Sequence, residues 1–293
     1  MILEALMPSL GSMRGRVVVV TGASSGIGRE TALLFGRLGA RVALVARRRP
    51  LLEKVAAEIR SRGGEALVVV ADVGREREVA AAFRHIRVAF GGVDVVVNNA
   101  GLLLPARCDE LRTIDLARMM RVNLFGALFV MQHAVRIMQV QAEGGSIVNV
   151  ASLAGRRGVS PIGGYCATKF ALVGLTEALR TELYGSPIHV GLVMPGVTDT
   201  PMVQGFSAHE ALDGLWPAAL TMPTAWVVWA ILAAVRFRLV EISVPPGAAT
   251  LEKLAALVPG LADSVVHWAA EATRTLSDLF ADGTSADTEL DTP

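Results

Sequence analysis

The chain has 293 residues and a formal net charge of +1, with 28 lysines and arginines against 27 aspartates and glutamates. Because there is no basic excess, the composition gives no indication of a nucleic-acid-binding protein. Hydrophobic residues make up 52% of the chain and charged residues 19%, which excludes a mainly disordered protein and allows a large core in a single α/β domain.

The cysteines, the histidines and the N-terminal segment indicate no disulfide framework, metal site or signal peptide. Cys108 and Cys166 are isolated thiols, so we expect a protein of the reducing cytoplasm. None of the histidines has the spacing of metal ligands, and we expect no metal. Residues 1–15 lack the basic start and the apolar run of a secretory signal.

Short apolar runs alternate with helical patterns along most of the chain. In chain order we expect strand 16–20, helix 27–38, strand 41–46, helix 51–62, strand 67–71, helix 76–90, strand 93–97, helix 116–141, strand 146–150, helix 165–184, strand 190–194 and strand 241–244. Strands that are apolar throughout and alternate with helices predict a parallel sheet covered on both faces. Right-handed crossovers then give a Rossmann-type doubly wound sheet, which belongs to the α/β class.

An uncharged stretch near the C-terminus could be taken for a membrane span. Residues 214–235 carry no charge, but Pro217 and Pro223 interrupt them. The uninterrupted part is too short to cross a bilayer. We therefore expect a loop followed by a buried helix over residues 224–235, and a helix lying on a membrane surface is the alternative.

The C-terminal part of the chain differs in pattern from the rest. We divide the chain into a main domain over residues 1–250 and a helical tail over residues 251–293. The tail is amphipathic over residues 251–279, is interrupted at Pro259 and Gly260, and ends in a disordered acidic segment.

A glycine-rich turn follows the first expected strand and opens the first helix. Gly22 allows a tight turn, Gly26 lets a pyrophosphate approach the backbone, and Gly28 lets helix and strand pack closely. The helix N-terminus then offers free N–H groups to phosphates. The turn residues expected to bind a dinucleotide are Gly22, Ser24, Ser25, Gly26, Ile27 and Gly28.

The end of the second expected strand distinguishes between two dinucleotides. An acidic residue there binds the ribose 2′-hydroxyl of NAD, whereas an arginine suits the 2′-phosphate of NADP. The sequence has no acid at this position, and Arg47 is the first side chain able to reach the ribose. We therefore favour NADP(H) over NAD(H); the alternative is that Arg47 to Arg49 form only a solvated basic turn.

Further motifs follow in order along the chain. They are Asp72-Val73, Asn98-Asn99-Ala100-Gly101, Asn123, Ser152, Tyr165 with Lys169, and Pro195-Gly196 with Thr200. Together with the glycine-rich turn they make the chain resemble the short-chain dehydrogenase/reductase family, in its non-extended branch, over about residues 14–245. The resemblance implies that residues 1–250 are a dinucleotide-binding and catalytic domain of an oxidoreductase acting on CH–OH groups.

Four residues form the expected catalytic group. Tyr165 and Lys169 lie one helical turn apart and share a face. A nearby ammonium lowers the pKa of a phenol from its usual value of about 10, so Tyr165 becomes a usable general acid or base. Ser152 can hydrogen-bond the substrate oxygen as charge develops there. The resemblance implies that Lys169 also holds the nicotinamide ribose and that Asn123 positions a water that relays protons from Lys169.

The remaining cofactor contacts are implied by the resemblance and by position at the carboxyl ends of strands. These residues are Asp72 and Val73 for the adenine, Asn99, Ala100 and Gly101 for the adenosine ribose, and Pro195, Gly196, Val197 and Thr200 for the nicotinamide carboxamide.

Two segments are expected to wall the substrate pocket, residues 153–164 and residues 199–223. The second is rich in large apolar side chains for a segment that acts as a lid, which favours a lipophilic ketone, aldehyde or secondary alcohol. The alternative is that these side chains only close the lid on the core. Arg156 and Arg157 either meet an anionic group on the substrate or are solvated.

The favoured function is an NADP(H)-dependent oxidoreductase that interconverts a carbonyl compound and an alcohol. A non-catalytic NADP(H)-binding scaffold or regulator is the alternative. An epimerase or dehydratase acting on a nucleotide sugar is a third candidate, although the larger substrate domain typical of that branch is missing. A serine hydrolase is excluded, because Ser152 lacks the Gly-x-Ser-x-Gly frame.

The tail over residues 251–293 affects the expected number of subunits in the oligomer. Family members commonly pair through helices around Asn123 and Tyr165, and often form a second interface through the last strand. A long tail could cover that second interface, so we expect a homodimer, with a tetramer as the alternative. The tail could also roll over the active site or touch lipid, and we favour packing on protein because it lacks a lysine-rich face.

Overall fold

The computed structural model describes residues 12–204, 221–261 and 263–264. Seven strands form one parallel sheet in the order β3-β2-β1-β4-β5-β6-β7. The strands are β1 (Val17–Thr21), β2 (Arg41–Ala46), β3 (Glu65–Val70), β4 (Val95–Asn98), β5 (Gly145–Val150), β6 (Ile188–Pro195) and β7 (Glu241–Val244). The predicted Rossmann-type doubly wound fold is confirmed.

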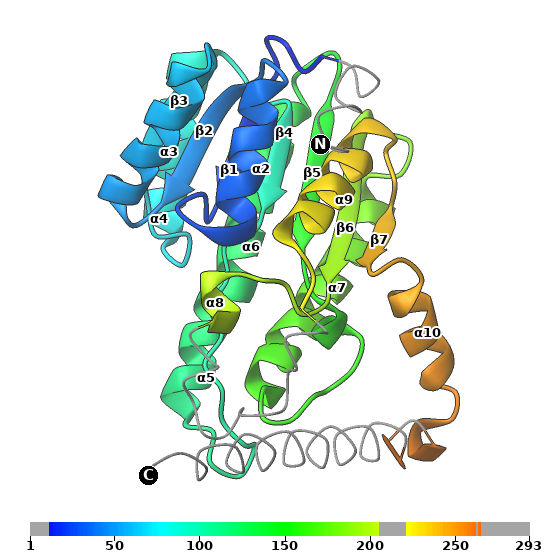
Figure 1. Ribbon diagram of the computed structural model, residues 1–293. Coiled ribbons are helices and arrows are strands. Elements are labelled where there is room, and N and C mark those ends of the chain that lie inside the picture. The colour runs from blue at the N-terminus through cyan, green and yellow to red at the C-terminus, as the bar shows by residue number, and fades with distance from the viewer. Residues whose placement is uncertain (1–11, 205–220, 262, 265–293) are drawn as a thin grey trace, which may run out of the picture.

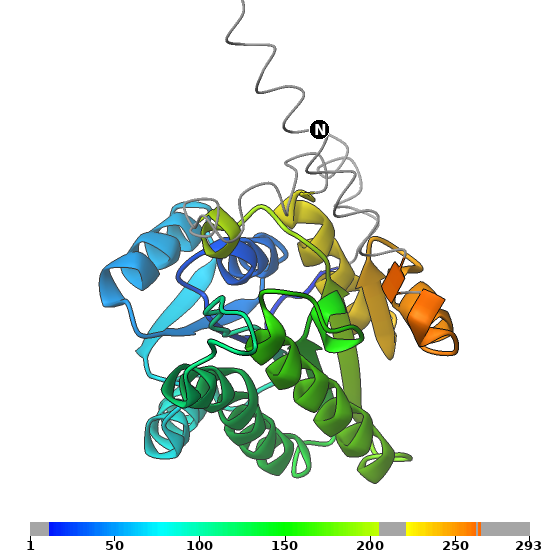
Figure 2. The same ribbon diagram turned by 90° about the horizontal axis from the view of Figure 1, so that it is seen from below.

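Helices cover both faces of the sheet (Figures 1 and 2). One face carries α2 (Gly26–Arg37), α3 (Arg49–Ser61) and α9 (Thr224–Arg236), and the other carries α4 (Glu76–Phe90), α6 (Ala127–Met138) and α7 (Gly163–Glu182). Successive residues of a strand point to opposite faces, so Val18 and Val20 enter one core cluster while Val17 and Val19 enter the other. This double burial explains why the strands are apolar throughout.

Helix α9 is the helix predicted over residues 224–235. Its side chains at Val227, Val228, Ile231 and Leu232 are buried in the same core cluster as those of α2. The buried-helix interpretation is therefore confirmed for α9, while residues 205–220 lie outside the described part. Among the described residues, no helix is both long enough and apolar enough to cross a membrane.

The long helix predicted over residues 116–141 has different ends and an irregular centre. It runs as α5 (Thr113–Met120), a π-helical turn at Arg121–Gly126, and α6. It ends at Met138 because the Gln141 side chain leaves the helical path to bond the main chain of Val93, accepting from its N–H and donating to its carbonyl oxygen, each at 3.0 Å. Single π-helical turns often occur at functional sites.

Helix α10 (Ala248–Ala255) spans the predicted boundary between the main domain and the tail at residue 251, and it lies beyond the carboxyl ends of the strands (Figure 1). The predicted interruption of the tail helix is present but lies at residues 256–258, and helical residues resume at Pro259 and Gly260. A proline fits the first turn of a helix, where its missing N–H has no partner to lose. Residues 265–293, with the predicted acidic end, lie outside the described part.

Candidate active site

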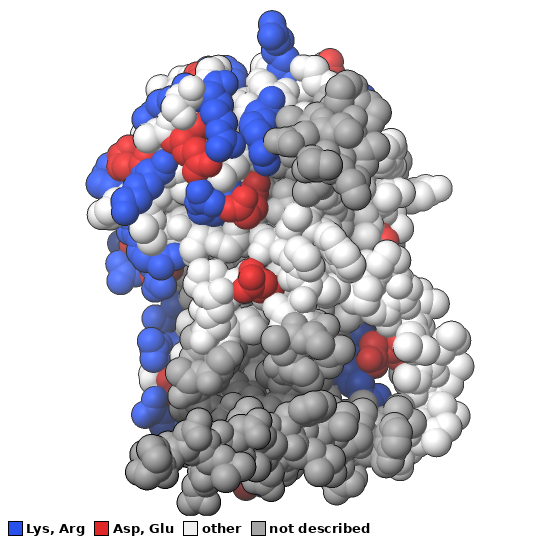
Figure 3. Space-filling model, in the orientation of Figure 1, with Lys and Arg blue, Asp and Glu red and all other residues white. Residues whose placement is uncertain are grey.

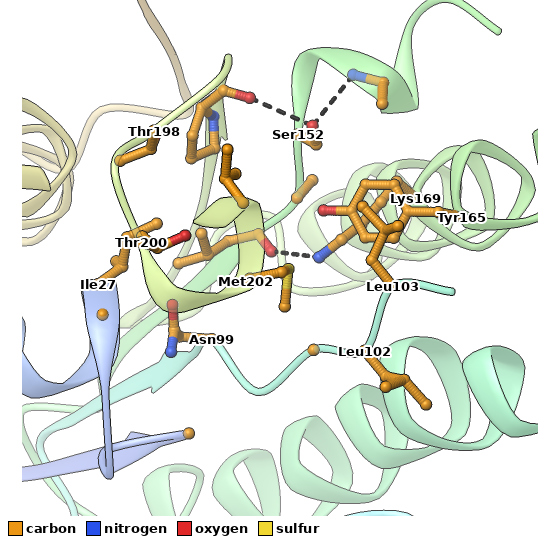
Figure 4. Close-up of a pocket in the computed structure, with 18 of the residues that line it drawn as sticks. Ile27, Asn99, Leu102, Leu103, Ser152, Tyr165, Lys169, Thr198, Thr200 and Met202 are labelled. Carbon is orange, nitrogen blue, oxygen red and sulfur yellow. Dashed lines mark hydrogen bonds between the residues drawn. The ribbon is translucent and has the colours of Figure 1, made fainter. Parts of the chain in front are cut away.

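One cleft of about 1470 Å³ lies at the carboxyl ends of the strands, and all but two of the predicted site residues line it. The exceptions, Gly28 and Asn123, lie behind its wall. A Cβ on Gly28 would clash with the carbonyl oxygen of Gly22, so only glycine lets α2 begin so close to the turn. Figure 4 shows residues from five parts of the chain pointing into this cleft.

The glycine-rich turn forms a cradle against the end of β4. Gly22 has φ +68° and Gly26 has φ +53°, in the left-handed region that glycine adopts without strain. A Cβ on Gly22 would lie 3.0 Å from the Cα of Ala100. Thr21 Oγ1 accepts hydrogen bonds from the N–H groups of Asn99 and Ala100, both at 3.0 Å. The open backbone at the start of α2 therefore fits a dinucleotide pyrophosphate.

A second arginine, not singled out from the sequence, reaches the cradle. Arg47 is exposed and lines the cleft as predicted. Arg48 Nη2 donates to Ser24 Oγ and Ser25 Oγ, each at 2.8 Å. The basic run that begins at Arg47 is the sequence signal for an arginine beside the cradle. The path of the chain before α3 decides that the Arg48 side chain is the one that reaches Ser24 and Ser25.

Asp72 and Val73 lie at the far end of the cleft, after β3. Asp72 Oδ1 accepts from the N–H of Gly74 at 3.0 Å, and the N–H of Asp72 donates to Glu78 Oε2 at 2.8 Å. These contacts hold the residue at the strand end, where it lines the cleft. Glu78 was missed by the sequence reasoning and positions the segment. Contact of Asp72 with adenine stays a prediction.

Tyr165 and Lys169 lie in the first half of α7, both buried. Lys169 Nζ donates to the carbonyl oxygen of Val150 at 2.9 Å and lies 5.5 Å from the centroid of the Tyr165 ring. The expected shared face is therefore present, and both side chains point into the cleft (Figure 4).

Burial shifts the pKa values of Tyr165 and Lys169 in the directions that favour the uncharged form of each group. Desolvation lowers the pKa of Lys169 to about 8. It also raises the pKa of Tyr165, against the opposing effect of a hydrogen bond with Ser152. In the protein alone the pKa of Tyr165 is therefore raised, because removing a phenolate from water costs more than the Ser152 hydrogen bond returns. The lowering of this pKa by the ammonium stays a prediction for the protein with its cofactor bound.

Ser152 combines a capping role with a place at the cleft. Its hydroxyl accepts from the N–H of Ala154 at 3.1 Å, which caps the short 3-10 helix Leu153–Gly155, and donates to the carbonyl oxygen of Pro195 at 3.2 Å. The hydroxyl thereby joins the ends of β5 and β6 on the same side of the cleft as Tyr165 (Figure 4).

Asn123 sits in the π-helical turn and is 1% exposed. Its amide donates to the carbonyl oxygen of Leu102 at 2.8 Å and to Thr168 Oγ1 at 2.9 Å, and its Oδ1 accepts from the N–H of Leu102 at 2.7 Å. These bonds fix the main chain of Leu102 beside α7. The water relay to Lys169 stays a prediction.

A model of the short chain dehydrogenase family matches residues 16–211. The chain belongs to the short-chain dehydrogenase/reductase family. Members of this family are oxidoreductases that use a nicotinamide cofactor, and the ordered motifs lie where that chemistry needs them, around one cleft.

Several relatives show how widely this dehydrogenase fold is shared. An uncharacterized oxidoreductase of Bacillus subtilis is 34% identical over 88% of this chain and 73% of its own length. A 3beta-hydroxysteroid dehydrogenase of Mediterraneibacter gnavus is 35% identical over 68% of this chain and 72% of its own length. The crystal structure of a Burkholderia phymatum short chain dehydrogenase/reductase in complex with NAD superposes with a TM-score of 0.76, at 26% identity, over 85% of this chain and 96% of that one.

The substrate half of the dehydrogenase cleft is mainly apolar. Its described walls come from the two predicted segments and from two places that the sequence reasoning missed, residues 102–103 and α9. The apolar side chains are Leu102, Leu103, Leu153, Val159, Ile162, Met202, Val203, Met222 and Trp226. Most of the predicted lid, with Phe206, Leu212, Leu215 and Trp216, lies outside the described residues.

The described part of the tail also reaches this half of the cleft. Glu252 of α10 and Asp263 line it. The apolar side chains of the described tail, at Leu251, Leu254 and Leu257, are exposed, so their packing on protein stays a prediction. Within the described ranges, no group of histidine, cysteine and acidic side chains could hold a metal ion.

Replacing Lys169 with methionine is expected to raise the free energy of unfolding of the dehydrogenase alone by about 2 kcal/mol at pH 7. Two free energies make up this difference. Removing the buried ammonium stabilises the folded state, and losing its hydrogen bond to Val150 offsets part of that gain. Below pH 8 the lysine is charged in both states, so the folded state bears the whole cost. From pH 8 to the ordinary lysine pKa of 10.5, only the unfolded chain keeps the proton, and the gap between variant and wild type closes.

Urea unfolding of the cofactor-free protein at pH 7 and at pH 10 measures this gap. Lys54→Met is the matched control, because Lys54 is exposed on α3 and should show no gap. A less stable Lys169→Met protein at pH 7 would contradict the expected cost of burying this ammonium.

Proposed function

We propose that this dehydrogenase interconverts a lipophilic ketone or aldehyde and the corresponding alcohol with NADP(H), with Tyr165 as general acid and base. The observation that carries the proposal is the placing of Ser152, Tyr165 and Lys169 in the cleft that also contains the glycine-rich cradle. A dinucleotide on the cradle and a carbonyl group beside Tyr165 would share this one space.

The proposed chemistry assigns each residue a proton or a contact. The bound nicotinamide supplies or accepts the hydride. Ser152 donates a hydrogen bond to the substrate oxygen as negative charge grows on it. The Tyr165 hydroxyl gives its proton to that oxygen in reduction and receives it back in oxidation, and the nearby Lys169 ammonium favours the phenolate left behind. Because burial raises the pKa of Tyr165, the residue holds its proton until the substrate oxygen can accept it.

The proposed preference for NADP(H) rests on the charges beside the cradle. Arg47 and Arg48 line the cleft after β2, and that strand ends without an acidic residue. Two guanidinium groups attract a 2′-phosphate, whereas the 2′-hydroxyl of NAD lacks the acceptor it prefers there. The structure of the Burkholderia phymatum relative contains NAD. The preference of this chain for NADP(H) over NAD(H) is therefore tested by comparing turnover with the two cofactors.

The proposed substrate is lipophilic because the walls around Tyr165 are aliphatic, thioether and indole groups. A relative that is named a 3beta-hydroxysteroid dehydrogenase supports the same class of substrate. Within the described part of the chain, Leu102, Leu153 and Ile162 form an apolar wall of the cleft.

The test is NADPH oxidation by the purified protein against ketones and aldehydes of increasing apolar size, repeated with NADH. We expect turnover to rise with substrate size and to prefer NADPH. Failure with every carbonyl compound and every alcohol, despite tight NADPH binding, would overturn the enzymatic proposal in favour of the scaffold or regulator.

We also propose a homodimer built on the face formed by the π-helical turn and α7. The Phe125 ring is 48% exposed and the Phe170 ring 45% exposed on these two elements, and exposed aromatic side chains favour an interface. Light scattering is expected to give the mass of two chains, and Phe170→Glu should shift it toward one. A tetramer would contradict the idea that the tail covers the second interface.

The proposed location is the cytoplasm. Cys108 and Cys166 are both free thiols, one exposed and one buried. Thiols that are left unpaired support a reducing compartment. Localisation of a tagged protein by cell fractionation tests this directly.

A further inference from the structure

Arg157 is a nearly buried cation in the substrate half of the cleft. It follows the 3-10 helix after Ser152 and lines the cleft with Val159, Ile162 and Tyr165. Its side chain is 17% exposed. A guanidinium group withdrawn from water needs a compensating negative charge. This part of the cleft is therefore suited to an anion held beside apolar walls.

The preceding arginine is already neutralised and faces elsewhere. Arg156 Nη2 donates to Glu177 Oε1 at 2.6 Å and to Glu241 Oε2 at 3.0 Å. These two carboxylates, from α7 and β7, fix the arginine beneath the tail, and its side chain is not part of the cleft wall. Of the two arginines noted in the sequence, only Arg157 is placed to meet a substrate.

Other arginines of the cleft wall lie at its edges. Arg48 belongs to the cofactor cradle. Arg107 lines the cleft, but its side chain is 63% exposed and pairs with the neighbouring Asp109. Within the part of the chain that the structure describes, Arg157 is the cation enclosed by the substrate half of the cleft, apart from the buried Lys169 ammonium beside Tyr165.

The counter-charge on Arg157 comes from the tail. Asp263 Oδ1 accepts from Arg157 Nη2 at 2.6 Å. The Asp263 side chain is 79% exposed, so most of it remains in water. An ion pair with one well-hydrated partner contributes little to stability. Another carboxylate that enters through the cleft can therefore take its place at small cost.

We propose that the substrate carries a carboxylate remote from its reacting carbon, and that Arg157 binds this carboxylate in exchange for Asp263. The inference rests on the proposed oxidoreductase function and narrows its substrate class to lipophilic oxo acids and hydroxy acids. The apolar walls hold the hydrocarbon part, and the guanidinium group receives the charged end.

An acidic side chain on the cleft wall favours a singly charged ligand over a doubly charged one. Glu252 of α10 lines the same half of the cleft. Its negative charge repels a second charge on the ligand, so a phosphate monoester fits less well than a carboxylate. Asp263, itself a carboxylate on Arg157, has the chemistry that the substrate would reproduce.

The experiment compares oxo acids of increasing chain length with their methyl esters, in kcat/KM with NADPH. We expect the wild type to prefer the acids. Arg157→Gln should lower kcat/KM for the acids by about 10- to 100-fold, the usual effect of losing a charge-assisted hydrogen bond, and leave the esters nearly unchanged. Asp263→Asn should lower KM for the acids alone, because the competing carboxylate is gone.

Controls separate recognition from general damage. Arg84→Gln, at an exposed position on α4, should match the wild type with both classes of substrate. Arg157→Lys should recover part of the preference for acids, because it keeps the charge. Equal use of acids and esters by the wild type, or an equal loss of both in Arg157→Gln, would overturn the inference.

A binding measurement separates this inference from the proposed function. Calorimetric titration of a saturated fatty acid and of its methyl ester, with NADPH present, needs no turnover. Tighter binding of the acid that is lost in Arg157→Gln supports the inference even if no carbonyl compound is reduced. Turnover of simple ketones without this difference in binding would sink the inference and leave the oxidoreductase proposal standing.

Discussion

Tyr165→Phe is expected to lower kcat for ketone reduction by about 10²- to 10⁴-fold, the range for loss of a general acid. Binding of NADPH should stay within a few-fold of wild type. The phenyl ring keeps the packing of Tyr165 with Met119, Ile162 and Cys166, so only the proton donor is removed. Stopped-flow or steady-state NADPH oxidation gives kcat, and quenching of NADPH fluorescence gives the dissociation constant.

Tyr184→Phe is the matched control for this change. Tyr184 is the other tyrosine of the chain and is 94% exposed. It should lose its hydroxyl without effect on kcat or on cofactor binding. A Tyr165→Phe protein that reduced ketones at the wild-type rate would show that another group delivers the proton.

Arg48→Gln is expected to raise KM for NADPH by about 10- to 100-fold and to leave KM for NADH nearly unchanged. The size follows from the loss of one charge-assisted hydrogen bond to a phosphate. Arg48 reaches back to Ser24 and Ser25, so its guanidinium group lies at the cradle where the ribose phosphate would sit. The ratio of kcat/KM for the two cofactors measures the effect.

Arg49→Gln serves as the control, because the Arg49 side chain is 66% exposed and pairs with Glu53 on α3, away from the cleft. It should change neither cofactor constant. An equal loss with NADPH and NADH in Arg48→Gln would mean that the arginine only braces the turn through Ser24 and Ser25, and the preference for NADP(H) would then rest on Arg47 alone.

The sequence reveals some features of the catalytic group and not others. The spacing of Tyr165 and Lys169 indicates a shared helix face, because residues four apart lie one turn apart in any α-helix. The sequence does not reveal how deeply that face is buried. Burial raises the pKa of Tyr165 and lowers the pKa of Lys169 to about 8.

The sequence by itself determined the α/β class, the doubly wound sheet and the order of the cofactor motifs. These depend on local patterns: apolar runs buried on both faces, glycines at positive φ, and side chains at the ends of strands. It did not determine the π-helical turn that carries Asn123, or the fact that helical residues resume at Pro259.

Only the tertiary structure decided which of two adjacent arginines bends toward the cradle, and which of Arg156 and Arg157 lines the cleft. The same holds for Asn123, whose amide bonds Leu102 and Thr168. Such choices depend on groups that are far apart in the chain and meet only after packing. The periodicity of the sequence does not predict such long-range contacts, because the partner of a side chain and its exposure to water are set by the tertiary structure.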